Sequence, residues 1–246
     1  MALNELVPEP ARPISATATE VHTGPATDPL AWLATTPHTD ERWYWEVPED
    51  DTAWVGMGSA ATVSTSGPGR FDEAAREADQ LLSGLRVTGP PDAPLPRLAA
   101  GFAFDDTAQS GPWEPFGDGR LVLPAVQVLR RGGRTWVIRI DGHDRPTPVM
   151  VAPDPAGSIE VDAADWADEA SRAHYRHLVE LALEAIERGE LVKAVPCRSL
   201  RLERRPDVAR LLATLRSTYP ACATVGVSIG PQTRYSPAAL VSVAVG

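Results

Sequence analysis

The fold is indicated most clearly by residues 171–200, which read SRAHYRHLVELALEAIERGELVKAVPCRSL. Apolar side chains recur there at helical spacing, and Ser171 is of a residue type that caps helix starts. Gly189 is expected to end this helix, because glycine accepts the left-handed backbone found at helix C-termini. A strand over Leu191–Leu202 follows at once. The stretch therefore predicts a helix that leads directly into a strand carrying Lys193.

Similar patterns predict further elements on both sides of this stretch. We expect strands at Arg42–Val47, Thr52–Gly58, Leu121–Leu129, Thr135–Ile140, Ala221–Ile229 and Leu240–Val245, and helices at Phe71–Leu85 and Asp207–Thr218. Hairpins mixed with helices predict an α+β fold with antiparallel or mixed sheets and flanking helices. Residues 1–30 are rich in proline, threonine and alanine, so they are expected to form a flexible arm. That leaves 31–246 as a single domain.

Composition excludes several classes of function. The formal net charge of -10 and the pI near 5.0 argue against a nucleic-acid partner, which requires a basic face. No apolar run approaches the roughly 18 residues of a membrane span, and the N-terminus has no signal-peptide pattern. Cys197 and Cys222 both lie in apolar segments, so neither a disulfide framework nor a zinc site is indicated. These features together predict a soluble, cytoplasmic protein.

Two regions resemble the chorismate-utilising enzymes. In the first, Glu187–Arg198, a helix ends in Gly-Glu before a strand, and Lys193 and Arg198 fall on the lysine and arginine of the family motif. The second region resembles the isochorismate synthase branch of the family. Its motifs are Gly101–Asp106, Trp113, Phe116 and Leu121–Pro124, with Trp43–Glu46, Gly56 and Gly58 upstream. The resemblance runs from about Trp43 to the end of the chain and implies the fold of that family.

The resemblance also implies a reaction. Isochorismate synthases convert chorismate to isochorismate with Mg²⁺, in menaquinone or siderophore biosynthesis. Water adds at one ring carbon while a hydroxyl group leaves another, so the enzyme needs one residue to deprotonate the water and one to protonate the leaving oxygen. The resemblance gives the role of general base to Lys193. A covered lysine can act as a base near neutral pH, whereas a lysine at a strand edge only packs its stem and extends its ammonium group to solvent.

The sequence departs from the family pattern at three places. Ala238 stands at the position of the glutamate that acts as the acid, in a segment that otherwise matches through Ser236, Pro237 and Leu240. Alanine can neither donate nor accept a proton. Pro196 interrupts the strand that carries the lysine. The Mg²⁺ ligands of the family and most groups that hold its substrate lie beyond the matched part, so we expect a truncated or degenerate chain that is inactive alone.

Other interpretations of the same residues remain open. The chain could be a non-catalytic relic of the family, or another chorismate enzyme of the salicylate or anthranilate synthase type. His174 and His177 have the spacing of a shared metal site, but no third ligand accompanies them. We interpret two further charged groups as solvated structure: the acidic helix entry with Asp162, Asp165, Asp168 and Glu169, and the arginines Arg198, Arg201, Arg204 and Arg205.

Overall fold

The computed structural model divides the chain into two compact units. The first combines Met1–Ala156 with Val208–Gly246, and the second is Gly157–Asp207. The structure describes residues 14–22, 24, 27–35, 41–105, 114, 116–142, 169–196 and 207–229, and the backbone of 238–245.

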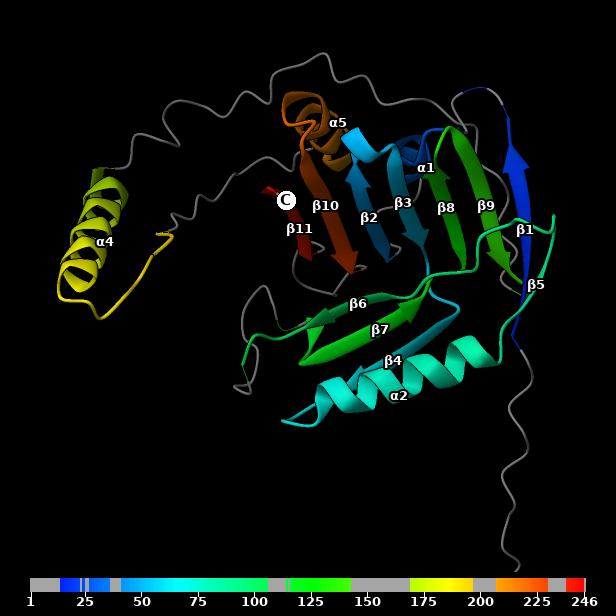
Figure 1. The fold of residues 1–246 in the computed structure, drawn as a ribbon, viewed down its shortest axis with the longest axis horizontal. Coiled ribbons are helices and arrows are strands. Elements are labelled where there is room, and N and C mark those ends of the chain that lie inside the picture. Colours follow the sequence, from blue (N-terminus) through cyan, green and yellow to red (C-terminus); the bar gives the residue numbers. More distant parts are fainter. Residues whose placement is uncertain are drawn as a thin grey trace, which may run out of the picture. The chain divides into compact units, whose positions relative to one another are not determined.

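An eight-stranded sheet forms the centre of the first unit (Figure 1). Its strand order is β11-β10-β2-β3-β8-β9-β1-β5. Neighbouring strands are antiparallel except β1 and β5, which are parallel. The strands are β1 (Ser15–Val21), β2 (Arg42–Val47), β3 (Thr52–Met57), β5 (Arg86–Thr88), β8 (Val126–Arg131), β9 (Arg134–Ile140), β10 (Cys222–Ile229) and β11 (Ala238–Val245). This mixed sheet with flanking helices confirms the predicted α+β fold.

A smaller sheet, in the order β4-β7-β6, packs on one face of the large sheet. Its strands are β4 (Ala61–Thr65), β6 (Ala99–Phe102) and β7 (Gly119–Leu123). Val122 of the small sheet is fully buried against Trp43 and Trp54 of the large sheet. Helix α2 (Arg70–Ser83) contacts β4 and β7 and forms the outermost layer on this side (Figure 1). The two sheets therefore enclose an apolar layer that includes the tryptophans of β2 and β3.

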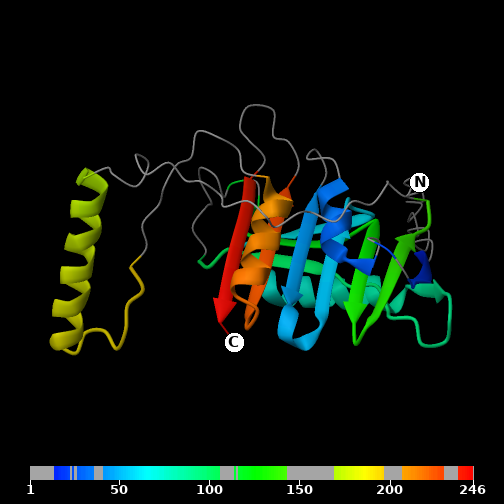
Figure 2. The ribbon, with the colours of Figure 1, turned by 90° about the horizontal axis from the view of Figure 1, so that it is seen from above.

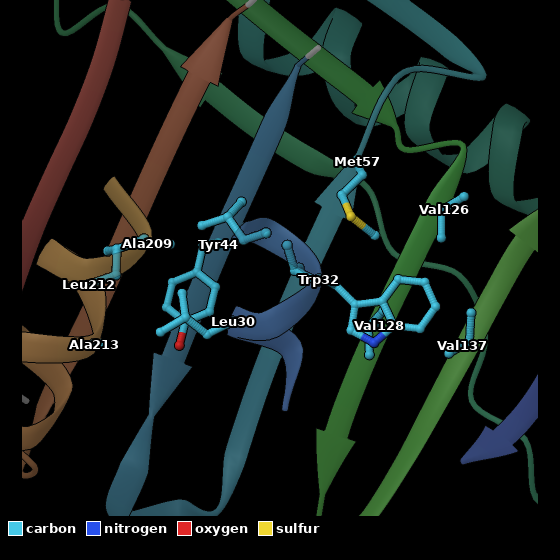
Figure 3. Packing of buried hydrophobic residues seen from close by; sticks show 12 residues of the cluster. Leu30, Trp32, Tyr44, Met57, Val126, Val128, Val137, Ala209, Leu212 and Ala213 are labelled. Atoms are coloured by element: carbon cyan, nitrogen blue, oxygen red, sulfur yellow. The ribbon is translucent and has the colours of Figure 1, made fainter. Parts of the chain in front are cut away.

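Helices α1 (Pro29–Thr35) and α5 (Val208–Thr218) cover the other face of the large sheet. Seen from above, α5 lies over β10 and α1 over β3 (Figure 2). Figure 3 shows the buried side chains that fill the space between these helices and the sheet. Gly226 of β10 lets α5 approach closely, because a Cβ atom there would lie 3.1 Å from a methyl carbon of Leu212. A larger residue at this position would therefore require the Leu212 side chain to shift.

Two predicted hairpins are confirmed, and turn chemistry accounts for both. The β2–β3 connection is a 3₁₀ turn, Pro48–Asp50, followed by Asp51 with a φ of 45°. The β8–β9 connection uses Gly132 and Gly133, with φ values of 57° and 74°. Positive φ at both central residues matches the right-handed twist of the flanking strands, and glycine adopts it without steric cost. These turns fix the register of the central four strands.

The prediction of a flexible arm over residues 1–30 is wrong for residues 15–21. This segment forms β1, in which Ala16 and Ala18 are buried against the side chains between the sheets while Thr17 and Thr19 are exposed. The alternation typical of a strand is therefore present in the sequence. The buried residues are alanines, however, and alanine is depleted in strands and gives a weak apolar signal.

The single strand predicted over Leu121–Leu129 is also wrong, because the chain forms β7 and β8 there, in different sheets. The chain changes sheets at Pro124 and Ala125. Proline has no N–H to donate to a ladder, so it ends β7 and allows the bend. Pro124 also packs over Gly56, where a Cβ atom would lie 2.5 Å from its Cγ.

The second unit contains helix α4, Glu169–Glu187, among the residues that the structure describes. None of its residues is buried within this unit. No helix in the described part of the chain, α4 included, is long and apolar enough to cross a membrane.

Candidate functional site

The end of α4 agrees with the sequence prediction. Gly189 has a φ of 73°, and the backbone N–H of Glu190 donates to the carbonyl of Ala185 over 2.9 Å. This is the glycine-terminated helix end in which a left-handed residue satisfies the last carbonyls. The helix start differs from the prediction, because α4 begins at Glu169 and Ser171 lies inside it rather than at its N-cap.

The strand predicted over Leu191–Leu202 is wrong for residues 191–196. This segment has no regular secondary structure, and no described strand pairs with it. A strand requires a neighbour for its backbone hydrogen bonds, and Pro196 cannot donate one. Residues 197–202, including Cys197 and Arg198, lie outside the described residues.

Lys193 lies on this irregular segment with an exposed side chain. Its apolar neighbours Val192 and Val195 are 97% and 81% exposed, so the described residues provide no covered face around the lysine. Lys193 has no hydrogen-bond or ion-pair partner among the residues that the structure describes. Its ammonium group is thus accessible, and its role as general base stays a prediction.

Ala238 is the first residue of β11, and its backbone pairs with Ile229 of β10. It therefore lies at the start of an edge strand of the large sheet, in the first unit. Lys193 belongs to the second unit. The match of Ala238 to the acid position stays a prediction.

The described residues do not form a metal site. His174 and His177 are exposed on α4, and the Nδ1 atom of His177 lies 3.9 Å from a carboxylate oxygen of Glu180. Within the described ranges, no three histidine, cysteine, aspartate or glutamate side chains gather around a common point. The described residues thus do not fit the Mg²⁺ ion that the family resemblance implies. Several charged candidates lie outside those ranges: Asp162, Asp165, Asp168, Arg198, Arg201, Arg204 and Arg205.

A cavity of about 410 Å³ opens between the two sheets of the first unit. We call it the aromatic cavity. It is lined by Trp43 and Val227 of the large sheet, by Ala100, Gly101, Phe102 and Arg120 of the small sheet, and by Ala103, Phe104, Phe116 and Gly117. Trp43, the segment starting at Gly101, and Phe116 carry the resemblance described above. Segments far apart in the sequence thus meet around one cavity.

Arg120 is the charged residue of this lining, and it is neutralised by Glu41. The Nε and Nη2 atoms of Arg120 donate to the two carboxylate oxygens of Glu41 over 3.0 and 2.9 Å. Only 8% of the Glu41 side chain is exposed. A bidentate pair of this kind is strong and directional, so it holds the guanidinium group against β2.

A second group of charges lies beneath α1 and α5. We call it the Glu46 cluster: Asp28, Tyr44, Glu46, Asp51, Arg130 and Arg216. Arg130 donates to Glu46 over 2.7 Å and pairs with Asp51 at 3.0 Å. Arg216 of α5 donates to both carboxylate oxygens of Asp28 over 2.9 and 2.8 Å. Every charge in the cluster is therefore paired, although four of its members line a wide cavity of about 570 Å³: Asp28, Glu46, Arg130 and Arg216.

Burial sets the protonation behaviour of the Glu46 cluster. The Tyr44 hydroxyl donates to Glu46, and its pKa is raised well above the usual 10.0 by desolvation first and by the nearby Glu46 charge second. Burial alone lowers the pKa of Arg216, but the hydrogen bonds and the charge of Asp28 outweigh it, so the pKa is raised overall. The tyrosine stays neutral and the arginine stays charged, as expected of a structural network that pins α5 to the sheet.

Comparison with known proteins decides the family. The sequence of residues 11–243 matches the family described as chorismate binding enzyme.

This chain belongs to the chorismate-binding enzymes. It is similar to the salicylate biosynthesis isochorismate synthase of Pseudomonas aeruginosa, with 34% identity over 96 residues, which are 39% of this chain and 19% of that protein. The structure of the menaquinone-specific isochorismate synthase from Escherichia coli matches 94% of this chain and 50% of that chain, with a TM-score of 0.50 and 19% identity. The chain thus spans about half the length of this solved structure, and at that identity the likeness shows the fold alone.

The sequence did not reveal either group of side chains in the first unit of this member of the family. The aromatic cavity joins β2, β6, β7 and β10, and the pairing of β2 with β10 spans more than half of the chain. The Glu46 cluster joins residues as far apart as Asp28 and Arg216. A signal was present in Arg42–Val47, where Tyr44 and Glu46 face one side of the strand and Trp43 the other.

Proposed function

We propose that the chain binds chorismate, and that Lys193 holds the position of the general base that deprotonates the attacking water in the isochorismate-forming reaction of the family. The observation that carries this proposal is the family match over residues 11–243, which includes Lys193. The named relatives are isochorismate synthases, which favours this reaction over those of salicylate or anthranilate synthases.

The composition of basic residues supports the role of Lys193. The chain has 23 lysine and arginine residues, and Lys193 is the single lysine among them. The guanidinium group of arginine stays protonated at physiological pH, so arginine cannot accept a proton from water, whereas a lysine amine can once its pKa is lowered. The remaining 22 of these residues are arginines, and the single lysine stands at the position where proton transfer is proposed.

By itself, this chain is proposed to bind chorismate without converting it. The residue proposed for the acid position is Ala238, and loss of a positioned acid typically lowers the rate by about 10²–10⁴-fold. The described residues also leave Lys193 exposed and supply no metal site. Ala238→Glu alone is therefore expected not to restore turnover.

The test combines a binding titration with a coupled assay that consumes isochorismate in the presence of Mg²⁺. The wild type, Lys193→Ala and Ala238→Glu are compared, with Lys193→Arg as a variant that keeps the charge but cannot act as a base. We expect calorimetry to detect chorismate binding by the wild type and the assay to detect no isochorismate from any variant. Turnover by the wild type would contradict the proposal that this chain does not convert chorismate, and turnover that survives Lys193→Ala would also contradict the role of the lysine.

A further inference from the structure

The aromatic cavity has the dimensions and lining of a small-molecule site. Its volume of about 410 Å³ lies within the range of about 300–1,000 Å³ that is usual for ligand pockets. Trp43, Phe102, Phe104 and Phe116 supply aromatic surface from three separate segments of the chain. Phe104 is 101% exposed, although a phenyl ring in water gains most from burial. The cavity therefore presents aromatic surface that a ligand could cover.

Gly101 keeps the cavity open. A Cβ atom at this position would meet only the tip of the Trp43 ring, at 4.0 Å, which is an ordinary contact distance. Gly101 needs no left-handed backbone, since its φ is not positive. The glycine is thus not required by the fold of β6 or by close packing. Its effect is to leave space above the Trp43 ring.

The charge at the cavity selects the kind of ligand. Arg120 is the charged side chain of the lining, and its Nε and Nη2 atoms are paired with the Glu41 carboxylate. An anion would meet a guanidinium group whose charge Glu41 already neutralises, and it would also lose hydration against aromatic walls. An uncharged ring has neither cost.

We propose that the aromatic cavity is a binding site for one small, uncharged ring compound of one or two fused rings, packed against the edge of the Trp43 ring and covered by Phe104. This site goes beyond the proposed reaction. Chorismate is a dianion and the ligand proposed here is uncharged, so the two proposals concern ligands of different charge.

The test uses the full chain and two probes that share a ring system, neutral 2-naphthalenemethanol and anionic 2-naphthoate. Binding is followed by quenching of tryptophan fluorescence and by calorimetry. We expect the alcohol to bind at least about tenfold more tightly than the carboxylate. Equal or tighter binding of the carboxylate, or no binding of the alcohol, would overturn the proposal.

Three variants locate the bound alcohol. Gly101→Leu fills the cavity and should weaken binding by at least about tenfold. Gly69→Leu is the matched control, because a side chain at Gly69 would project into open space. Phe104→Ser removes a fully exposed ring, so it should weaken binding without affecting folding even if Gly101→Leu proves unstable. Unchanged affinity in Phe104→Ser and in a folded Gly101→Leu would place the ligand elsewhere and overturn the proposal. Chorismate should not displace the alcohol, and titrating chorismate separately tests the proposed reaction.

Discussion

Removing the charge of Glu46 should destabilise the first unit far more than removing the charge of Asp51. Both carboxylates pair with Arg130, at 2.7 and 3.0 Å. Glu46→Gln and Asp51→Asn therefore each remove one negative charge paired with the same guanidinium group. Their surroundings differ, because the side chain of Glu46 is 2% exposed and that of Asp51 is 47% exposed.

The expected magnitudes follow from this difference in burial. A buried hydrogen bond to a charged group contributes about 1.5–3 kcal/mol, and complete loss of one partner of a buried pair costs about 3–5 kcal/mol. Arg130 keeps Asp51 and Arg216 keeps Asp28 when Glu46 is neutralised. We therefore expect Glu46→Gln to lower the free energy of unfolding by about 2–3 kcal/mol. A half-exposed pair contributes less than about 1 kcal/mol, which sets the expectation for Asp51→Asn.

Urea unfolding followed by tryptophan fluorescence measures both values, because Trp43 and Trp54 are buried in the same unit. Equal losses in the two variants would refute the reasoning, since they would show that burial of the Glu46 cluster does not determine its contribution. A loss in Glu46→Gln below about 1 kcal/mol would have the same meaning.

Two further outcomes are expected. The pKa of Tyr44 is higher in the folded state than in the unfolded chain. The stability that this residue contributes is therefore present below pH 10 and falls as pH rises above it. Tyr44→Phe should make the free energy of unfolding, measured in alkaline urea titrations, fall less steeply with pH. Gly56→Ala should destabilise the unit by about 1–3 kcal/mol, because the added Cβ would lie 2.5 Å from Pro124. Gly69→Ala serves as the control, because a Cβ atom at Gly69 would lie in open space. Equal melting temperatures of the two variants would contradict this packing.

The sequence predicted those elements whose turn residues, end signals and apolar spacing all lie within one short stretch. The β8–β9 hairpin carries its turn glycines and alternating apolar residues in one short stretch. Helix α5 was predicted as Asp207–Thr218 and is observed at Val208–Thr218, because its apolar spacing and the following Pro220 define both ends. The family resemblance, which rested on ordered motifs rather than on one residue, is confirmed by the match over residues 11–243.

Features that depend on distant partners were not predicted. Residues 15–21 form a strand because β9 and β5 pair with them, since alanine itself has a low propensity for strands. Residues 191–196 have strand-like composition but no neighbouring strand in the described structure. The Arg120–Glu41 pair joins residues 79 positions apart, and nothing local in either segment indicates it. Pairing between remote segments is a property of the whole fold rather than of a window of sequence.

The most direct test of the central claim is whether chorismate protects Lys193. Because Lys193 is the single lysine, acetylation by an amine-reactive ester reports on it alone once peptide mapping separates it from the N-terminal amine. At chorismate ten times above its Kd, the rate of Lys193 acetylation should fall about tenfold, while benzoate at the same concentration should leave it unchanged. An unchanged rate in saturating chorismate would contradict the claim that Lys193 meets the substrate.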